Sequence, residues 1–265
     1  REGHLYPSIV GYADNILVNG VIIGLIIIGG IGFLTWEDIC EYKWKFKSYR
    51  MQSKLILATT VCLIIFPACF FFFADFQHLP VKSRFLASVF QSVTPRTAGF
   101  NTVDITMMTE ASKVVMILLM LIGGSPGSTA GGMKTTTFAV LLLNAVATFK
   151  SQEHAGAFGR RIDDQVIKNA ASIAMLYFMM FLAGGIVIST AEGLPILGSL
   201  FEAASAMGTV GLTLGITPSL HKISLYVLIL LMYMGRVGGL TLIYAVFSGK
   251  NKANARFPME KVMIG

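Results

Sequence analysis

Two segments of this chain, Thr97-Ala98-Gly99-Phe100 and Thr209-Val210-Gly211-Leu212, carry almost the same pattern. Each follows an apolar stretch that is too short to cross a bilayer, and each precedes a long apolar run. Gly123 follows Gly99 by 24 residues, and Gly235 follows Gly211 by the same 24 residues. Glycine permits backbone angles that other residues resist, so a Thr-x-Gly turn between a half-length and a full-length helix predicts carbonyls that line a cation filter.

The composition places the chain in a membrane. It is 54% hydrophobic and only 13% charged, whereas a soluble domain has about 25% charged residues. Apolar runs approach or exceed the roughly 18–20 residues that span a bilayer. They cover residues 15–33, 55–74, 114–122 continued by 135–146, 170–189 and 223–247. We therefore expect an all-α, multi-pass membrane protein.

The net charge of +7 is gathered in three clusters that occupy alternate connections between the apolar runs. The clusters are Lys43, Lys45, Lys47, Arg50 and Lys54; Lys150, Arg160, Arg161 and Lys168; and Lys250, Lys252, Arg256 and Lys261. This pattern follows the positive-inside rule, so these connections and the C-terminal tail are predicted to face the cytoplasm of a cell-membrane protein. It favours a membrane orientation over nucleic-acid binding.

The long apolar runs and short segments repeat as a unit of rising helix, pore half-helix, filter-like turn and descending helix. Complete units are predicted over 51–150 and 151–265, and residues 1–50 add the descending helix of an earlier unit plus a cytoplasmic linker. No Thr-x-Gly turn lies 24 residues before Gly29, so the filter of that earlier unit is expected to be lost or to precede Arg1. Two turns cannot surround an ion, whereas four equivalent turns around a pseudo-fourfold pore can.

A glycine pattern supports the assignment of residues 1–50 to an earlier, partial copy of the repeated unit. Ile28-Gly29-Gly30-Ile31 is similar to Ile122-Gly123-Gly124-Ser125 and to Met234-Gly235-Arg236-Val237. The second of these patterns opens a longer segment that precedes the next apolar run. This segment, residues 123–135, reads Gly-Gly-Ser-Pro-Gly-Ser-Thr-Ala-Gly-Gly-Met-Lys-Thr. Such a segment cannot continue a helix cheaply, and non-helical backbone at membrane depth must be buried or line a cavity. It is not a phosphate loop, because Met133 separates Gly132 from Lys134.

These turns and this segment resemble the Trk/Ktr/HKT superfamily of potassium transport proteins, and most nearly the membrane subunit of bacterial Ktr-type uptake systems. The resemblance covers essentially the whole chain and implies the second half of repeat two through repeat four of a four-repeat pore. It implies potassium as the ion, no organic cofactor, a homodimer in membrane lipid, and a cytosolic ring of nucleotide-binding regulatory subunits. Within the superfamily, glycine at all four key filter positions goes with potassium preference.

The candidate site therefore has two parts. The filter consists of Thr97, Ala98, Gly99, Phe100, Thr209, Val210, Gly211 and Leu212, with potassium bound through the backbone of Thr97, Gly99, Thr209 and Gly211. The gate consists of Gly124, Ser125, Pro126, Gly127, Ser128, Thr129, Gly131, Gly132, Lys134 and Arg236, and it is expected to lie well below the filter. Ordinary glycine turns, a simple kinked helix and a structural ion pair of Arg236 remain alternative interpretations.

Two further groups complete the sequence-based predictions. Gln91 and Glu202 occupy similar places in the half-helices and are expected to form hydrogen bonds behind the filter. Cys40, Cys62 and Cys69 are predicted to be small buried side chains rather than a disulfide framework. The apolar runs contain no paired acids, Ser-His pair or zinc motif, which argues against an intramembrane enzyme. A sodium-permeable or sodium-coupled transporter of the same fold and a non-conducting scaffold remain open.

Overall fold

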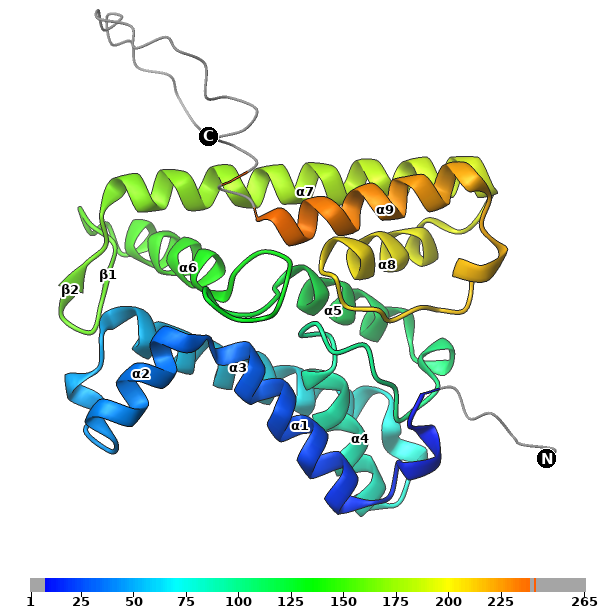
Figure 1. Cartoon of the computed structure of the whole chain (residues 1–265), viewed down its shortest axis with the longest axis horizontal. Coiled ribbons are helices and arrows are strands. Elements are labelled where there is room, and N and C mark those ends of the chain that lie inside the picture. The colour runs from blue at the N-terminus through cyan, green and yellow to red at the C-terminus, as the bar shows by residue number, and fades with distance from the viewer. Residues whose placement is uncertain (1–7, 239–240, 242–265) are drawn as a thin grey trace, which may run out of the picture.

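The computed structural model of the chain describes residues 8–238 and 241 and is mostly helical (Figure 1). The α-helices are α1 (Ile16–Ile31), α2 (Phe33–Tyr42), α3 (Met51–Ala74), α4 (Val81–Val93), α5 (Glu110–Leu121), α6 (Thr135–Phe149), α7 (Asp164–Glu192), α8 (Ile196–Met207) and α9 (Lys222–Val237). Strands β1 (Gly156–Ala157) and β2 (Arg160–Arg161) form an antiparallel hairpin. Short 3-10 turns are η1 (Val10–Tyr12), η2 (Phe46–Ser48), η3 (Phe76–His78), η4 (Ile105–Met107) and η5 (Thr217–Ser219).

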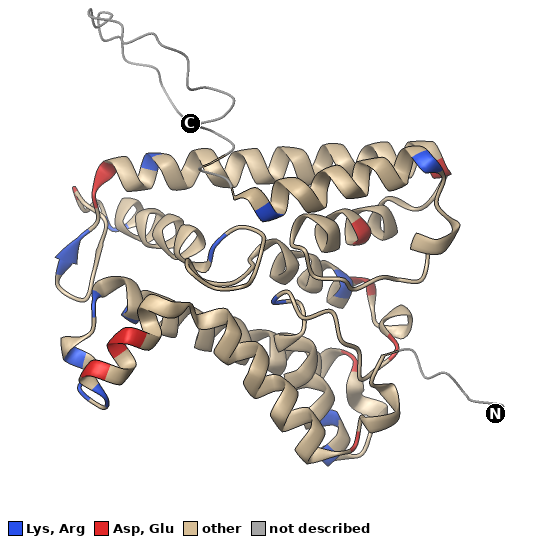
Figure 2. Cartoon of the chain, viewed as in Figure 1, with Lys and Arg blue, Asp and Glu red and all other residues tan. Residues whose placement is uncertain are grey.

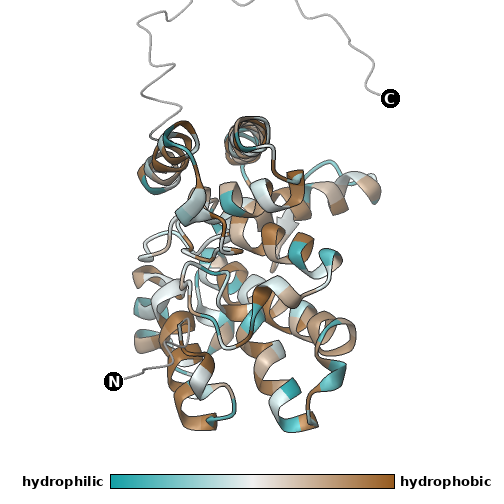
Figure 3. Ribbon diagram, turned by 90° about the vertical axis from the view of Figure 1, so that its right-hand side faces the viewer, coloured by the Kyte–Doolittle hydropathy of each residue, from teal (hydrophilic) through white to brown (hydrophobic). Residues whose placement is uncertain are grey.

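The helices form two halves, α1–α4 and α5–α9, with segments of coil between them (Figure 1). Figure 3 shows that the helices are mostly hydrophobic, whereas the coil between the halves contains more residues of low hydropathy. Backbone outside helices needs hydrogen-bond partners that lipid cannot supply. Placing the irregular segments between the halves gives them protein partners.

Within the described residues, a long helix, a half-length helix, a coil turn and a further helix follow one another twice. Helices α3 and α7 are each long and apolar enough to cross a membrane, with mean hydropathies of 2.5 and 2.2. They are followed by the half-helices α4 and α8, of 13 and 12 residues. Each half-helix leads into a coil turn and then into a further apolar helix, α5 or α9. The prediction of an all-α, multi-pass membrane fold is confirmed.

The descending helix predicted over 15–33 corresponds to α1, and the segment predicted as a linker contains a second helix, α2. The helix breaks at Gly32, and α2 leaves α1 at an angle of 98°. Gly32 has a φ of +88°, and a Cβ there would lie 2.4 Å from the carbonyl oxygen of Pro126. Close packing against a segment far along the chain therefore accompanies the break. Gly238, which ends α9, has almost the same backbone angles, with φ +89° and ψ 140° against +88° and 148°.

The largest group of buried apolar side chains surrounds α8. This helix packs against α5, α7 and α9, and its residues Phe201, Ala203, Ala204 and Met207 are fully buried. Burial on all sides suits a short helix that ends inside the protein, because neighbouring helices rather than lipid then contact its whole circumference. The core thereby fixes the position of the turn that follows Met207.

The prediction that the three cysteines are buried is wrong. Cys40, Cys62 and Cys69 are all exposed, and none forms a disulfide. Cys62 and Cys69 lie on α3, which also exposes large apolar side chains such as that of Phe66. In a helix that faces lipid, an apolar side chain can be exposed on the protein surface, so hydropathy alone does not indicate burial.

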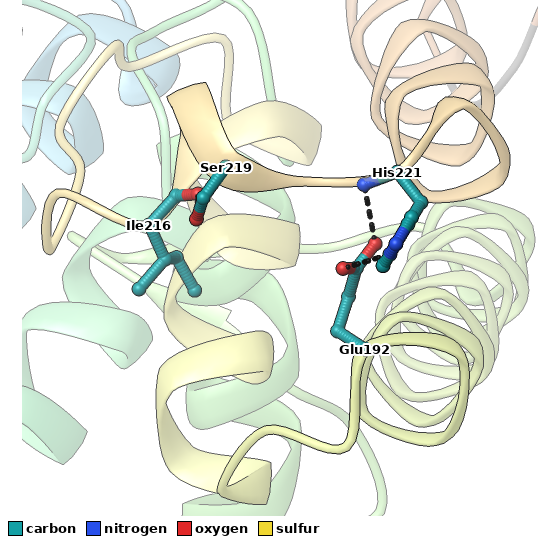
Figure 4. A network of polar contacts seen from close by, with 4 residues as sticks. All are labelled: Glu192, Ile216, Ser219 and His221. Atoms are coloured by element: carbon teal, nitrogen blue, oxygen red, sulfur yellow. Dashed lines mark hydrogen bonds and ion pairs between the residues drawn. The ribbon is translucent and has the colours of Figure 1, made fainter.

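Many of the charged residues lie toward the two ends of the long axis of the molecule (Figure 2). Figure 2 shows lysine and arginine gathered at the end that carries α2, the β-hairpin and the start of α7. At the opposite end, Glu192 of α7 accepts a hydrogen bond from the backbone N–H of His221 at 2.8 Å, and its other oxygen lies 2.6 Å from His221 Nδ1 (Figure 4). The Ser219 hydroxyl donates to Ile216 O at 2.8 Å in the preceding turn. The third basic cluster lies outside the described residues.

Candidate functional site

The two Thr-x-Gly turns adopt the same unusual backbone. Thr97 and Gly99 have φ values of +65° and +73°, and Thr209 and Gly211 have φ values of +52° and +94°. A β-branched residue rarely adopts a positive φ, because its side chain collides with its own backbone. Such strain is found at functional sites that the surrounding structure holds in place. In both turns the Thr and the Gly have a positive φ and the residue between them does not. This shared pattern distinguishes the two turns from ordinary glycine turns at helix ends.

The two turns lie against each other. A Cβ added to Gly99 would lie 2.4 Å from the carbonyl oxygen of Val210 and 3.3 Å from Cα of Gly211. The structure thus brings together two segments separated by more than a hundred residues, with backbone facing backbone at the key glycines. Thr97, Ala98 and Thr209 are half-buried, Phe100 and Gly211 are exposed, and Val210 and Leu212 are buried.

Hydroxyl groups at the ends of the half-helices hold both turns. The Thr94 hydroxyl donates to the carbonyl oxygen of Phe100 at 2.6 Å. In the second turn, the backbone N–H of Gly211 donates to Ser205 Oγ at 3.2 Å. Neither Thr94 nor Ser205 is predicted from the sequence as part of the site. A signal for them exists, since each hydroxyl residue follows a buried Phe, Phe90 or Phe201, by four positions.

The side chains of Glu202 and Gln91, at similar places in the two half-helices, differ in their hydrogen bonds. The buried carboxylate of Glu202 accepts hydrogen bonds from the Thr213 hydroxyl at 2.6 Å, from the Leu214 N–H at 3.0 Å and from the Thr217 hydroxyl at 2.7 Å. Glu202 therefore holds the segment after the second turn, as expected. Gln91 is also fully buried, but within residues 8–238 neither of its amide atoms has a hydrogen-bond partner.

A buried arginine lies beside the first turn. Arg96 directly precedes Thr97, is only 5% exposed and donates from Nη2 to the Thr60 hydroxyl at 3.3 Å. Nη2 also lies 4.0 Å from the Cβ position of Gly30. Arg96 thus joins the filter-like turn to α3 and α1. It follows the carboxyl end of α4, where unpaired carbonyl oxygens favour a cation.

The glycine-rich segment between α5 and α6 is a closed loop. Its two ends pair in parallel: Gly123 N–H donates to Met133 O at 2.8 Å, and Met133 N–H donates to Leu121 O at 3.2 Å. Next to this pair, the buried hydroxyls of Ser125 and Thr135 lie 3.1 Å apart. The loop interrupts the helix that the apolar runs predict, and it is more than a kink, because thirteen residues separate α5 from α6.

Backbone hydrogen bonds attach the loop to its neighbours. Ser125 N–H donates to Gly30 O of α1 at 3.0 Å, and Phe33 N–H of α2 donates to Gly127 O at 3.2 Å. On the other side, Gly132 N–H donates to Gly235 O of α9 at 3.1 Å. The loop therefore bridges the break after α1 and the end of α9.

Two cations bind successive carbonyl oxygens of the loop. Arg236 Nη1 donates to Thr129 O at 2.6 Å, and Lys134 Nζ donates to Ala130 O at 2.6 Å. Lys134 is half-buried and Arg236 is exposed. Within the described residues neither cation forms an ion pair, so both positive charges remain next to the loop.

The expectation that the loop lies well below the filter is wrong. A Cβ on Gly131 would lie 2.2 Å from the Thr209 hydroxyl oxygen, and one on Gly132 would lie 3.3 Å from Cα of Gly208. The loop, which runs from the end of α5 to the start of α6, therefore touches the start of the second turn. A cavity of about 660 Å³ adjoins this contact and is lined by Glu202, Thr209, Gly211 and Arg236, among others.

The fold and the paired turns define a class: a multi-pass membrane protein of repeated units, each with a half-length helix and a Thr-x-Gly turn. Residues 5–253 match the model of the TrkH family, described as cation transport protein. The chain belongs to this family, whose members are ion transporters and not enzymes.

Individual relatives agree. The chain is 37% identical to the potassium/sodium uptake protein NtpJ of Enterococcus hirae, over 98% of this chain and 60% of that protein. It is 35% identical to the Ktr system potassium uptake protein B of Bacillus subtilis, over the same shares. The chain thus spans about 60% of the length of these curated relatives.

A solved structure shares the fold. The crystal structure of the potassium transporter TrkH from Vibrio parahaemolyticus matches with a TM-score of 0.75. The match has 21% sequence identity and covers 91% of this chain and 54% of that one. This likeness shows the fold alone.

Proposed function

We propose that this chain supplies two of four filter strands, and the gate loop, of a potassium-conducting pore in the cell membrane. The observation that carries the proposal is the pair of turns with alternating left-handed Thr and Gly, Thr97/Gly99 and Thr209/Gly211, packed backbone to backbone. Such a backbone presents carbonyl oxygens in place of the hydration shell of a cation. Both key positions are glycine, which supports potassium over sodium.

The organisation proposed for the chain follows the same units. Residues 51–150 and 151–265 form two complete pore repeats, and residues 1–50 provide the second helix of an earlier one. Potassium is the cargo, and no organic cofactor is needed. The relatives in Bacillus subtilis and Vibrio alginolyticus are named as proteins of Ktr systems. We propose by analogy a homodimer in lipid, a cytosolic nucleotide-binding ring as partner, and a cytoplasmic C-terminal tail.

The gate is proposed to be the loop of residues 124–134 together with Arg236. The loop lies directly against Thr209 and is held by Arg236 and Lys134. A cation that leaves the filter on this side would meet two positive charges and a closed loop. Movement of the loop away from Arg236 would remove this barrier.

A sodium-permeable or sodium-coupled transporter is the second candidate, because one relative is named a potassium/sodium uptake protein. Uptake of rubidium and sodium by transport-deficient cells separates the candidates. The complete protein should restore rubidium uptake with little sodium uptake, whereas this chain without further repeats should not. Equal uptake of both ions would favour the second candidate. No uptake of either ion at normal expression would favour a non-conducting scaffold.

A further inference from the structure

Between α2 and α3 the chain carries a short run in which basic and aromatic residues alternate. This basic-aromatic segment is Lys43-Trp44-Lys45-Phe46-Lys47. All five residues are exposed, Trp44 to 99% and Phe46 to 45%. The segment lies at the basic end of the molecule, one helix after the break that ends α1 (Figure 2).

The backbone of this segment is anchored at both ends. The hydroxyl of the buried Tyr49 donates to Lys43 O, and Lys54 Nζ donates to Lys47 O at 2.7 Å. The Tyr49 ring also packs on Phe46, with ring centroids 5.5 Å apart. The segment is therefore an ordered surface feature, and its exposed side chains are displayed by a fixed backbone.

The positive charges of the segment are not neutralised by the acidic residues nearby. In α2, Glu37 and Asp38 both contact Arg50, at 2.9 and 3.4 Å. Lys43, Lys45 and Lys47 form no ion pair with any described residue. Three lysines within five positions thus remain available to a negatively charged partner.

A second loop extends the surface. Phe158 of the β-hairpin, 49% exposed, meets Phe46 edge-on with ring centroids 6.4 Å apart. Lys54 Nζ lies 5.9 Å from the centre of each ring. The exposed aromatic area therefore spans two connections that are far apart in sequence and belong to different repeats.

We propose that this surface binds the headgroups of anionic phospholipids in the adjacent membrane leaflet. Tryptophan is enriched where protein crosses the membrane–water interface, and lysines beside a membrane are attracted to anionic lipids. An acidic cytosolic protein would also be attracted to the three lysines. A membrane surface accounts in addition for the exposed Trp44, and for Phe33 and Leu34 of α2, which are 77% and 48% exposed.

The lipid contact is connected to the gate loop through α2. This helix begins next to Gly32, which packs on Pro126, and its Phe33 N–H donates to Gly127 O at 3.2 Å. The basic-aromatic segment follows the other end of the same ten-residue helix. A lipid that holds the segment at the interface therefore holds α2 and favours one position of the loop. This coupling rests on the transport function proposed above, whereas the lipid binding does not.

Fluorescence quenching tests the binding alone. The complete protein is reconstituted in mixtures of phosphatidylcholine and phosphatidylglycerol, with bromine atoms on one lipid or the other. The difference in emission between native protein and W44F reports Trp44. We expect brominated phosphatidylglycerol to quench Trp44 more than brominated phosphatidylcholine does. The variant K43Q/K45Q should reduce this preference by about tenfold, because two attractive charges near the anionic surface are lost.

The matched control is K150Q/K168Q, which removes two exposed lysines, one directly after α6 and one near the start of α7. It should leave the quenching of Trp44 unchanged. Equal quenching by the two lipids, or an equal loss in K150Q/K168Q, would overturn the proposal. A third result would also overturn the proposal: neither lipid quenches Trp44, and the K43Q/K45Q variant binds a cytosolic regulatory subunit less tightly than the native protein does. The surface would then be a protein-docking site.

Ion flux tests the coupling. Rubidium flux through the native protein should change when phosphatidylglycerol is added to the vesicles, and flux through K43Q/K45Q should change at least about fivefold less. A native protein whose Trp44 prefers phosphatidylglycerol but whose flux ignores it would overturn the coupling. Absence of rubidium flux in every lipid would instead contradict the transport function, and the quenching result would stand apart from it.

Discussion

Arg236 donates a hydrogen bond from Nη1 to the carbonyl oxygen of Thr129 at 2.6 Å, across 107 residues of sequence. The next carbonyl, that of Ala130, accepts from Lys134 Nζ at the same distance. A glycine-rich segment has several backbone arrangements of similar energy, so bonds of this kind select one of them. These two side chains therefore act together with the backbone hydrogen bonds of the loop in fixing its position beside Thr209.

Replacing Arg236 with Ala should raise basal potassium flux and weaken its dependence on regulatory subunits. A hydrogen bond to a charged group contributes about 1.5–3 kcal/mol, so the increase should reach about tenfold. Deletion of residues within Gly127–Gly132 should act in the same direction, because the shortened loop cannot reach Arg236. The measurement is flux into liposomes with and without the regulatory ring.

Arg161→Ala is the control for Arg236→Ala, since Arg161 is an exposed arginine that contacts Asp164 far from the loop. Its flux should equal that of the native protein. Unchanged basal flux and unchanged partner dependence in both gate variants would mean that the loop is only a structural interruption of the helix.

Gly99→Ser should reduce the preference for potassium over sodium more than Gly211→Ser. Both glycines have a positive φ, where a side chain costs about 1 kcal/mol. Only at Gly99 would the new Cβ also collide with backbone, 2.4 Å from Val210 O, whereas a Cβ on Gly211 would lie 3.8 Å from Gly99 Cα. Relative uptake of rubidium and sodium at matched expression measures the effect.

Gly193→Ser provides the comparison, because Gly193 has a φ of +66° and no neighbouring atom within 4 Å of its Cβ position. It carries the same backbone strain far from the turns and should leave ion preference unchanged. The filter assignment fails if both turn variants keep the native ratio of the two ions, or if Gly193→Ser alters it equally.

Glu202→Ala should destabilise the protein and disturb ion preference. The substitution leaves three donors, Thr213 Oγ1, Leu214 N and Thr217 Oγ1, without their acceptor. Thr213 is exposed, and Leu214 and Thr217 are half-buried, so each lost hydrogen bond should cost about 1 kcal/mol. Thermal unfolding in detergent and flux in liposomes measure the two effects.

Two variants calibrate the loss in Glu202→Ala. Glu202→Gln should cost less, because the amide oxygen still accepts and the Thr217 hydroxyl can accept in turn from the amide nitrogen. Thr217→Val removes one of the three bonds and should lie between native and Glu202→Ala. An alanine variant as stable and selective as native protein would show that Glu202 does not hold the turn.

The topology can be mapped by single cysteines in a background without the native ones, all three of which are exposed. Cysteine at Lys45 or Arg160 should resist a membrane-impermeant thiol reagent in intact cells, and cysteine at His78 or Glu192 should react. The corresponding site at Lys252 lies outside the described residues. Labelling from outside at position 160 in folded protein would reverse the proposed orientation.

Local features of the sequence were sufficient for the class of protein and the order of its elements. The apolar runs predict α3 and α7, and the short runs before Thr97 and Thr209 predict the half-helices α4 and α8. These predictions succeed because hydropathy and helix length report the transfer of one segment into the bilayer, which requires no knowledge of its neighbours. The matched 24-residue spacing likewise identifies the repeat within the chain itself.

Contacts between distant segments were decided only by the tertiary structure. The break at Gly32 coincides with the approach of Pro126, and Gly131 touches Thr209 although the sequence predicts the loop well below that turn. The hydroxyls of Thr94 and Ser205 become relevant only when the following turn folds back onto them. Hydropathy cannot indicate these contacts, because they depend on the close packing of backbone against backbone, which no single segment encodes.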